Sequence, residues 1–178
     1  TVAPVPVAEY QSVTIPVTIV VPYSSAFTLS ATTQPPNGGI TVSGETLTYT
    51  PMANFFGTDT FVFVVNDGMA SSDPVSVPVQ VTPVNDPPMA MDGMYDVTIG
   101  QSTSIEFKVT DIDSSSLTIN LVSGPSEGTL SGSGLNRTYT PDATFPGSDT
   151  IRFTVTDGQA TSAEATIMLS GSAANGSP

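Results

Sequence analysis

The sequence predicts an all-β protein that consists of two tandem antiparallel β-sandwich domains. Three observations predict it: a block of residues recurs after ninety positions (139 − 49 = 90), apolar residues alternate along short runs, and Gly, Pro, Asn and Asp separate those runs. Alternation of period two is typical of a half-buried strand, and the intervening residues are typical of turns. The sequence shows no sustained period of 3.6 residues, which would indicate an amphipathic helix.

The repeated block holds the same residue types in the same order in both copies. The first copy comprises Tyr49-Thr50-Pro51, Phe55, Gly57-Thr58-Asp59-Thr60, Phe61-Val62-Phe63-Val64-Val65 and Asp67-Gly68, and the second comprises Tyr139-Thr140-Pro141, Phe145, Gly147-Ser148-Asp149-Thr150, Ile151-Arg152-Phe153-Thr154-Val155 and Asp157-Gly158. A long-period repeat indicates a chain of several similar units. We therefore predict domain 1 at residues 1–86 and domain 2 at residues 87–178, each near the size of one sandwich.

The apolar run in each block is predicted to be a central strand. The residues that should face the core are Phe61, Phe63 and Val65 in the first copy and Ile151, Phe153 and Val155 in the second. The polar residues Arg152 and Thr154 alternate with them and mark the solvent-facing side. The Asp-Gly pair after each run is a turn signal, because Gly tolerates positive φ and Asp can accept hydrogen bonds from nearby backbone.

Further strands are expected on both sides of the block. They are Val13–Ile19 and its equivalent Ile105–Val109, Phe27–Leu29 and Leu117–Ile119, a hairpin of Ile40–Val42 with Leu47–Tyr49, and Val75–Val81 with Ala165–Leu169. Prolines interrupt residues 1–11, which confines that extended segment to an edge strand or a linker. In Thr82–Pro88, the two prolines after Asn85-Asp86 predict a stiff linker, and residues 171–178 are expected to be a flexible one.

The composition argues against several partners and chemistries. The net charge is −13 and the only basic residues are Lys108, Arg137 and Arg152, whereas nucleic acids and anionic membranes select clustered Lys and Arg. The charge favours cations instead, especially hard cations that bind oxygen ligands. There is no Cys for a disulfide or a thiolate metal site, and no apolar run of the roughly 18 residues that a membrane span needs. The absence of an initial Met suggests a processed or excised chain.

The repeated motifs resemble those of a known family. Tyr-Thr-Pro, Phe-x-Gly-(Ser/Thr)-Asp-Thr and Val-x-Asp-Gly, followed by Val84-Asn85-Asp86-Pro87-Pro88, are similar to the tandem cadherin-like and immunoglobulin-like repeats of large bacterial surface proteins such as adhesins. The resemblance covers nearly the whole chain. It implies a secreted or cell-surface protein whose partners are neighbouring repeats, identical subunits, or a carbohydrate or protein ligand.

The resemblance also implies a calcium site at the junction of the domains. In the cadherin arrangement, the linker Asn-Asp, an Asp-x-Asp of the next domain and the Asp after its central strand surround the ion. Carried over by position, these ligands are Asn85, Asp86, Asp111, Asp113 and Asp157. Calcium takes about six to eight oxygen ligands, and carboxylates are common among them. The alternative is that these are turn residues, as Asp and Asn often are.

Departures from the cadherin pattern predict a weak site. Pro83 stands where an acid is usual in the linker, and Ser114–Ser116 replace an acidic continuation. The Glu that many such repeats carry before their first strand is missing around Gly100-Gln101. We therefore expect an affinity no better than the weak range of extracellular calcium modules.

Domain 1 is expected to bind no calcium at its outer end. The positions equivalent to Asp111 and Asp113 are Val21 and Tyr23, which leaves Asp67 without acidic partners. Asp67 is therefore predicted to be a turn residue.

The sequence offers little for catalysis, and we predict that the chain is not an enzyme. It has no His to act as a base and no Cys nucleophile. Asp111 and Asp113 could imitate the carboxylate pair of a glycosidase, but paired acids where a strand meets a loop are more often cation ligands in repeat domains. Lys108 alternates out of phase with Phe107 and Val109, so it should face solvent and cannot form a buried isopeptide bond.

Three functions remain open at this point. The leading hypothesis is an extracellular structural or adhesive module of a cell-surface adhesin or stalk, rigidified by calcium. The second is a subunit of an extracellular filament in which residues 1–11 add a strand to a neighbouring subunit. The third is a carbohydrate-binding appendage of a secreted enzyme. It would need exposed aromatic side chains, for which only Tyr10, Tyr23 and Tyr95 are candidates because the chain has no Trp.

Overall fold

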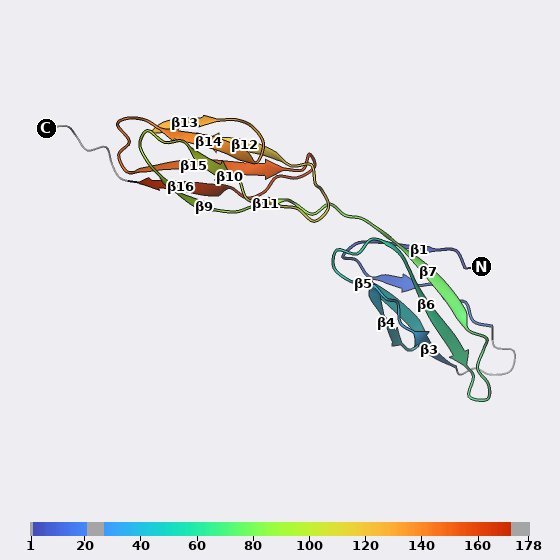
Figure 1. Ribbon diagram of the computed structural model, residues 1–178. Helices are drawn as coiled ribbons and strands as arrows, with labels where there is room; N and C mark the ends of the chain where they lie inside the picture. Colours follow the sequence, from blue (N-terminus) through green and yellow to red (C-terminus); the bar gives the residue numbers. More distant parts are fainter. Residues whose placement is uncertain (1, 21–26, 172–178) are drawn as a thin grey trace. The chain divides into compact units, whose positions relative to one another are not determined.

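The computed structural model describes residues 2–20 and 27–171, which divide into two compact units, Thr1–Val84 and Asn85–Pro178 (Figure 1). We call these units domain 1 and domain 2. The boundary lies two residues earlier than predicted (86 − 84 = 2), and both Asn85 and Asp86 are hydrogen-bonded to residues of domain 2. The described residues form strands, and among them there is no helix long and apolar enough to cross a membrane.

Domain 1 is a sandwich of two sheets with the strand orders β1-β7-β6-β3 and β2-β5-β4. The strands are β1 (Val5–Ala8), β2 (Val13–Ile15), β3 (Thr28–Thr33), β4 (Gly38–Ser43), β5 (Thr46–Pro51), β6 (Gly57–Asn66) and β7 (Val75–Thr82). Pairing is antiparallel except between β1 and β7. Both sheets contribute to one core: Ile15, Ile40, Leu47 and Tyr49 come from one, and Leu29, Phe61, Phe63, Val77, Val79 and Val81 from the other.

Domain 2 repeats this plan with the strand orders β12-β15-β16-β9 and β10-β14-β13 and adds a short pair, β11-β8. Its strands are β8 (Met89–Ala90), β9 (Gly93–Val97), β10 (Thr103–Glu106), β11 (Val109–Thr110), β12 (Thr118–Ser123), β13 (Gly128–Ser131), β14 (Asn136–Pro141), β15 (Ser148–Thr156) and β16 (Ala165–Gly171). Its core is a separate cluster. The predicted all-β fold of two sandwiches is thus confirmed.

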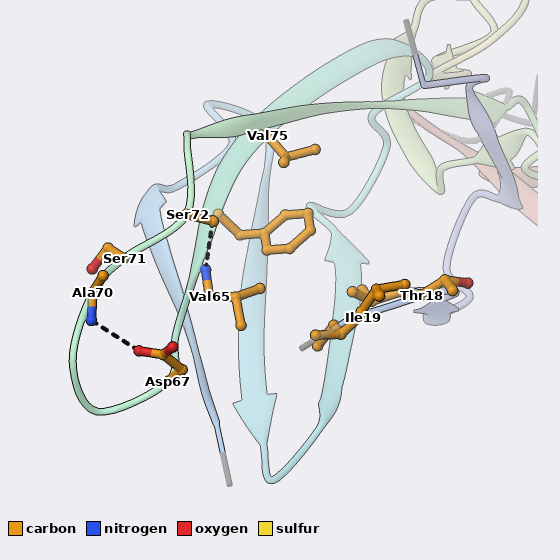
Figure 2. A pocket seen from close by; sticks show the side chains of 11 residues that line it. Thr18, Ile19, Val65, Asp67, Ala70, Ser71, Ser72 and Val75 are labelled. Carbon is orange, nitrogen blue, oxygen red and sulfur yellow. Dashed lines mark hydrogen bonds between the residues drawn. The ribbon is translucent and has the colours of Figure 1, made fainter. Parts of the chain in front are cut away.

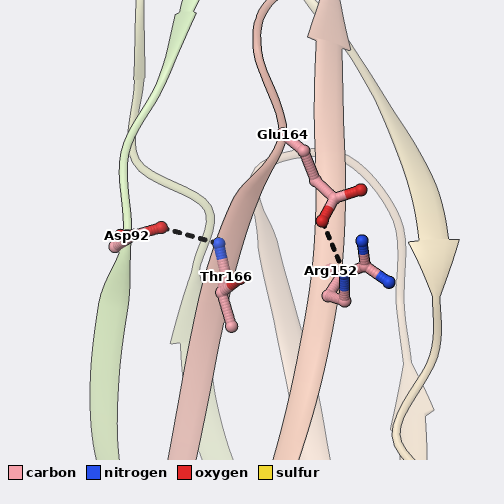
Figure 3. A network of polar contacts seen from close by, with 4 residues as sticks. All are labelled: Asp92, Arg152, Glu164 and Thr166. Atoms are coloured by element: carbon pink, nitrogen blue, oxygen red, sulfur yellow. Dashed lines mark hydrogen bonds and ion pairs between the residues drawn. The ribbon is translucent and has the colours of Figure 1, made fainter.

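The central strands β6 and β15 face the core with nearly all the predicted residues. Phe61 and Phe63 are buried on β6, and Ile151, Phe153 and Val155 are buried on β15. The prediction for Val65 was wrong in degree, because this side chain is only half-buried and lines an open groove. On the opposite face of β15, Arg152 is exposed and pairs with Glu164 of the neighbouring chain segment (Figure 3).

The N-terminal segment forms the edge strand that its prolines predicted. Val5–Ala8 run parallel to β7, with Val5 opposite Val79 and Ala8 opposite Thr82. The side chain of Val7 is buried in the core of domain 1. Donation of residues 1–11 to another subunit would therefore require this internal pairing to break.

The strand predicted over Val13–Ile19 is shorter in the structure, because β2 ends at Ile15. The equivalent strand of domain 2 ends one residue further on, at Glu106. There the Tyr95 hydroxyl accepts a hydrogen bond from the Glu106 backbone N–H and donates one to its carbonyl. Domain 1 has Pro16 at the equivalent position, so no N–H needs a partner, and Val5 takes the place of Tyr95.

A buried Tyr–Asp pair explains why Tyr-Thr-Pro and the acid ten residues later recur together. In domain 1 the Tyr49 hydroxyl donates to Asp59 Oδ2 at 3.0 Å, and in domain 2 the Tyr139 hydroxyl donates to Asp149 Oδ2 at 2.9 Å. All four residues are buried. The aromatic ring also explains a glycine, since a Cβ at Gly128 would lie 2.7 Å from the Tyr139 ring and 2.5 Å from the Thr140 carbonyl oxygen. The repeated motif therefore connects the two sheets of each sandwich.

Backbone donors keep the buried acid of this pair charged. The Asp149 carboxylate accepts hydrogen bonds from the backbone N–H groups of Ser126, Glu127 and Thr150. Burial opposes ionisation, but these three donors and the Tyr139 hydroxyl outweigh it and hold the pKa of Asp149 below its usual value. Burial, reinforced by the hydrogen bond to Asp149 and its charge, raises the pKa of Tyr139 far above the usual value.

Candidate metal site

The five residues expected to bind calcium all lie in domain 2. Asn85 and Asp86 are its first residues, Asp111 directly follows β11, and Asp157 directly follows β15. The end of a strand is where a loop can bring polar groups from different parts of the chain together. Here the loops after β11 and β15 meet the segment that leads into the domain.

Hydrogen bonds join these five residues into one network. The Asn85 side-chain amide donates to Asp157 Oδ2 at 2.8 Å. The Asp86 backbone N–H donates to Asp113 Oδ2 at 2.6 Å, and the Asp113 backbone N–H donates to Asp111 Oδ1 at 2.8 Å. Sequence positions 72 residues apart (157 − 85 = 72) are thus in direct contact.

The alternative interpretation, that these acids are turn residues, is correct for Asp157 and Asp111. Asp157 Oδ1 accepts the backbone N–H groups of Gln159 and Ala160 at 2.6 Å each. Asp111 Oδ1 accepts those of Asp113 and Ser114. Each turn uses only one carboxylate oxygen, so the other oxygen is left for another role.

In domain 1, the equivalent acid Asp67 has the turn role without the acidic network. Asp67 Oδ1 accepts the backbone N–H groups of Met69 and Ala70 at 2.9 and 2.8 Å, in the same pattern as Asp157. The turn also needs Gly68, whose φ of 91° favours glycine. The predicted role of Asp67 is therefore confirmed. The positions equivalent to Asp111 and Asp113, Val21 and Tyr23, lie outside the described residues.

The two carboxylate oxygens of Asp111 differ in their surroundings. Asp111 Oδ2 is buried, and it has no hydrogen-bond partner in the described part of the chain. A buried carboxylate oxygen without a partner destabilises the fold, by about 1–3 kcal/mol for a polar group and more for a charged one. A cation is a suitable partner for such an oxygen.

The donor set fits a hard cation in kind, but its arrangement would have to change. Nowhere in residues 2–20 and 27–171 do three or more acidic groups converge so that they could hold an ion as they stand. The Asn85 amide nitrogen now faces Asp157, while Asn85 Oδ1 accepts the Gln159 side-chain amide. To bind an ion, Asn85 would have to give up its hydrogen bonds with Asp157 and Gln159, and Asp113 would have to give up its bond with the Asp86 backbone N–H.

One of the five residues, Asp157, is held in its charged form by hydrogen bonds. The backbone N–H of Ala160, the Asn85 amide and the backbone N–H of Gln159 hold the pKa of Asp157 below its usual value. A deprotonated carboxylate is the form that binds a metal. No proton needs to leave Asp157 before an ion binds.

Sequence reasoning missed one buried acid in domain 1, Glu9. Its side chain is only 1% exposed, Oε2 accepts the backbone N–H of Val84 at 3.1 Å, and Oε1 is buried without a partner among the described residues. The equivalent position in domain 2 is Ile99. The sequence holds a sign of this role, because Glu9 is the only charged side chain in residues 1–11. Its equivalent, Ile99, lies next to Gly100, where the family pattern has a Glu that domain 2 does not.

The aromatic side chains proposed for carbohydrate binding do not form a platform in the described residues. The Tyr95 hydroxyl is hydrogen-bonded to the backbone of Glu106, and its ring packs partly against the core. Tyr10 is 45% exposed and donates to Asn54 Oδ1. Tyr23 lies outside the described residues.

Comparisons with known proteins identify the two repeated units. A family model described as "Bacterial Ig domain" matches residues 1–80 and again residues 85–170. No curated protein matches the sequence.

Solved structures of cadherin repeats share the fold. Human mucin-like protocadherin EC1-2 superposes with a TM-score of 0.56 at 19% identity over 94% of both chains. Human CDH23 EC21-23 gives 0.52 at 16% identity, over 82% of this chain and 58% of that one. The endo-fucoidan hydrolase MfFcnA4 from glycoside hydrolase family 107 gives only 0.38 at 20% identity, and the chain covers 27% of its length. At these identities the likeness to the two cadherin structures shows the fold alone.

Proposed function

Since the chain belongs to the bacterial Ig domain family, in two tandem copies, we propose that it is a non-catalytic structural or adhesive module of an extracellular surface protein. The low content of basic residues and the tandem sandwiches support a spacer or adhesive role. Neighbouring repeats or identical subunits are its proposed partners. The internal pairing of β1 with β7 and the lack of an aromatic platform in the described residues favour this role over a strand-donating filament subunit and over a carbohydrate-binding appendage.

We further propose that this module is stiffened by a weakly bound calcium ion. Asp111, Asp113 and Asp157 would supply carboxylate oxygens, and Asn85 would turn its amide oxygen to the ion. The observation that carries the proposal is the buried Asp111 Oδ2, which has no hydrogen-bond partner among the described residues and lies inside the network that joins all five residues. The ion would neutralise part of the local negative charge and hold the segment Asn85-Asp86 against the loops after β11 and β15.

A calorimetric melt with chelator and with millimolar calcium tests the ion. A ligand that binds only the folded state stabilises it by RT ln(1 + [L]/Kd), or about 1.4 kcal/mol when calcium is in tenfold excess over Kd. For a domain of this size that free energy raises the melting temperature of domain 2 by about 5–11 °C. An unchanged melting temperature up to 10 mM calcium, about tenfold above the weak end of the expected Kd range, would contradict the proposal.

Matched variants locate the effect. Asp111→Asn keeps an oxygen for the turn but removes a charge, so it should abolish most of the calcium-dependent shift. Asp67→Asn makes the same change in the equivalent type of turn in domain 1 and should leave the shift intact. Equal shifts in the two variants would place the ion elsewhere.

A further inference from the structure

The two domains differ at one edge, where domain 2 has a pair of short strands that the described part of domain 1 does not have. In domain 2, β8 pairs antiparallel with β11, with Ala90 opposite Val109 and Met89 opposite Thr110. The Met91 backbone N–H extends the pairing by donating to the Lys108 carbonyl at 3.0 Å. The offset of ninety places the equivalent of β11 at Ile19-Val20, and the equivalent of β8 at the two positions before Thr1.

Domain 1 has an open groove at this place (Figure 2). Residues 16–20 belong to no strand, and Val20 is 86% exposed. The groove has a volume of about 420 Å³, and Figure 2 shows Thr18 and Ile19 on one side and Val65, Asp67, Ala70 and Val75 on the other. Its described lining is mostly apolar, and Asp67 is the one charged residue among the described residues that line it.

In domain 2 the surface equivalent to this groove is buried, and β8 lies against β15 there. Val155 and Ala165 are 0% and 2% exposed, whereas their equivalents Val65 and Val75 are only half-buried. Ala90 of β8 packs against the core of domain 2. The sandwich is therefore closed at this edge in domain 2 and open in domain 1.

One difference in side-chain size enlarges the groove. Phe107 packs edge-on against Phe153 in domain 2, with ring centroids 4.8 Å apart, and the equivalent of Phe107 is Val17. The smaller residue does not account for the missing backbone pairing at Ile19-Val20. An occupant must therefore supply both backbone groups and apolar atoms.

We propose that this groove is an acceptor for an extended peptide strand joined directly to Thr1, of the chemistry seen in Pro87–Ala90, such as the linker of a neighbouring repeat. The strand runs antiparallel to residues 18–20, exchanges backbone hydrogen bonds with them, and places a small apolar residue over Val65 and Val75. Prolines before the paired residues keep the strand short and extended. A linker of this kind would then belong structurally to the domain that follows it.

The connection length favours a strand from the same polypeptide. In domain 2 only Met91 and Asp92 separate β8 from β9, the equivalent of β1. Asp92 Oδ1 accepts the backbone N–H of Thr166 at 2.7 Å and fixes this short connection to β16 (Figure 3). Domain 1 has Val2 in place of Asp92, so the strand there depends on the backbone pairing and the apolar groove.

An extension of the full chain tests this, with chelator present so that the outcome does not depend on calcium. The sequence Asn-Asp-Pro-Pro-Met-Ala, copied from residues 85–90, is added directly before Thr1. Amide hydrogen exchange at residues 18–20 should slow about tenfold or more, and domain 1 should melt several degrees higher. The matched controls are an extension of Gly and Ser of equal length, and the same extension with its last Ala changed to Asp. Neither should have these effects.

Two outcomes would overturn the proposal. The first is equal protection by the Gly-Ser extension, or no protection by the copied one. The second is a different occupant of the groove. The unextended chain would then dimerise, and Val20→Asp would abolish the dimer. Alternatively, a free peptide Pro-Pro-Met-Ala-Met would protect residues 18–20 from exchange as well as the joined strand does.

Discussion

At the scale of single residues, the buried Tyr–Asp pair accounts for most of the repeated motif. One carboxylate satisfies a tyrosine hydroxyl and several backbone N–H groups, and in domain 2 these come from three different residues. Burying a charge costs much less free energy when hydrogen bonds satisfy it in this way. The motif is therefore a structural element that holds the sheets of each sandwich together.

Substitutions in this pair should differ in cost. Tyr139→Phe removes one donor and should lower the free energy of unfolding of domain 2 by about 1–2 kcal/mol. Asp149→Asn turns one acceptor oxygen into a donor that faces backbone N–H groups, so it should cost about 3 kcal/mol. Denaturant unfolding measures both changes, with the exposed Asp142→Asn as the control. A smaller effect of Asp149→Asn than of Tyr139→Phe would contradict the role assigned to the carboxylate.

The pH dependence of domain 2 follows from the same carboxylate. The pKa of Asp149 is lower in the folded state than in the unfolded chain, where it is about 3.9. Its contribution is therefore fully present above that value and is lost as the pH falls through the folded-state pKa. Acid titration of unfolding should show domain 2 losing stability below about pH 4. Asp149→Asn should flatten that slope, and an unchanged slope would refute the assignment.

At the scale of elements, the two faces of a central strand have opposite roles. Phe153 of β15 is fully buried and packs against Phe107, whereas Arg152 on the other face makes an exposed ion pair with Glu164. Burial of aromatic surface contributes far more to stability than an exposed ion pair does.

Truncation on the two faces of β15 should therefore have unequal effects. Phe153→Ala should lower the free energy of unfolding of domain 2 by about 3–5 kcal/mol, because it leaves a cavity in the core. Arg152→Ala should cost about 0.5 kcal/mol, since it removes only a surface ion pair. Thermal or denaturant unfolding of both variants compares them. Similar costs would mean that the faces of the strand have been assigned wrongly.

At the scale of the whole molecule, the two domains have separate cores. No buried side chain of one core belongs to the other among the described residues, so each core can be lost alone. The chain is thus a pair of similar domains with different local features. The acidic network lies in domain 2, and the open groove lies in domain 1.

A variant that unfolds one domain should leave the other folded. If Phe153→Ala lowers the free energy of unfolding of domain 2 by more than that domain's total stability, the domain unfolds. Backbone amides of β14 and β15 should then exchange rapidly, while those of β5 and β6 stay protected. Residue-resolved hydrogen exchange at neutral pH measures this in the full chain. Simultaneous loss of protection in both domains would show that their stabilities are coupled.

Several features could be predicted from the sequence because they depend on local geometry. The alternation along β6 and β15 assigned the buried faces through Phe61 and Phe153, and the Asp-Gly pairs marked the turns at Asp67 and Asp157. Period-two alternation and the φ of Gly68 require only the backbone of a few neighbouring residues. The ninety-residue offset between the repeated motifs predicted two domains.

The tertiary structure decided the features that depend on distant contacts. The burial of Asp149 under Tyr139, the unpartnered Asp111 Oδ2 and the half-exposed Val65 involve groups that meet only after the sheets pack. The sequence of Val65-Asn66-Asp67-Gly68 is almost that of Val155-Thr156-Asp157-Gly158, yet Val155 is fully buried and Val65 is only half-buried. Burial is a property of the neighbours that the fold supplies, and a local pattern cannot specify them.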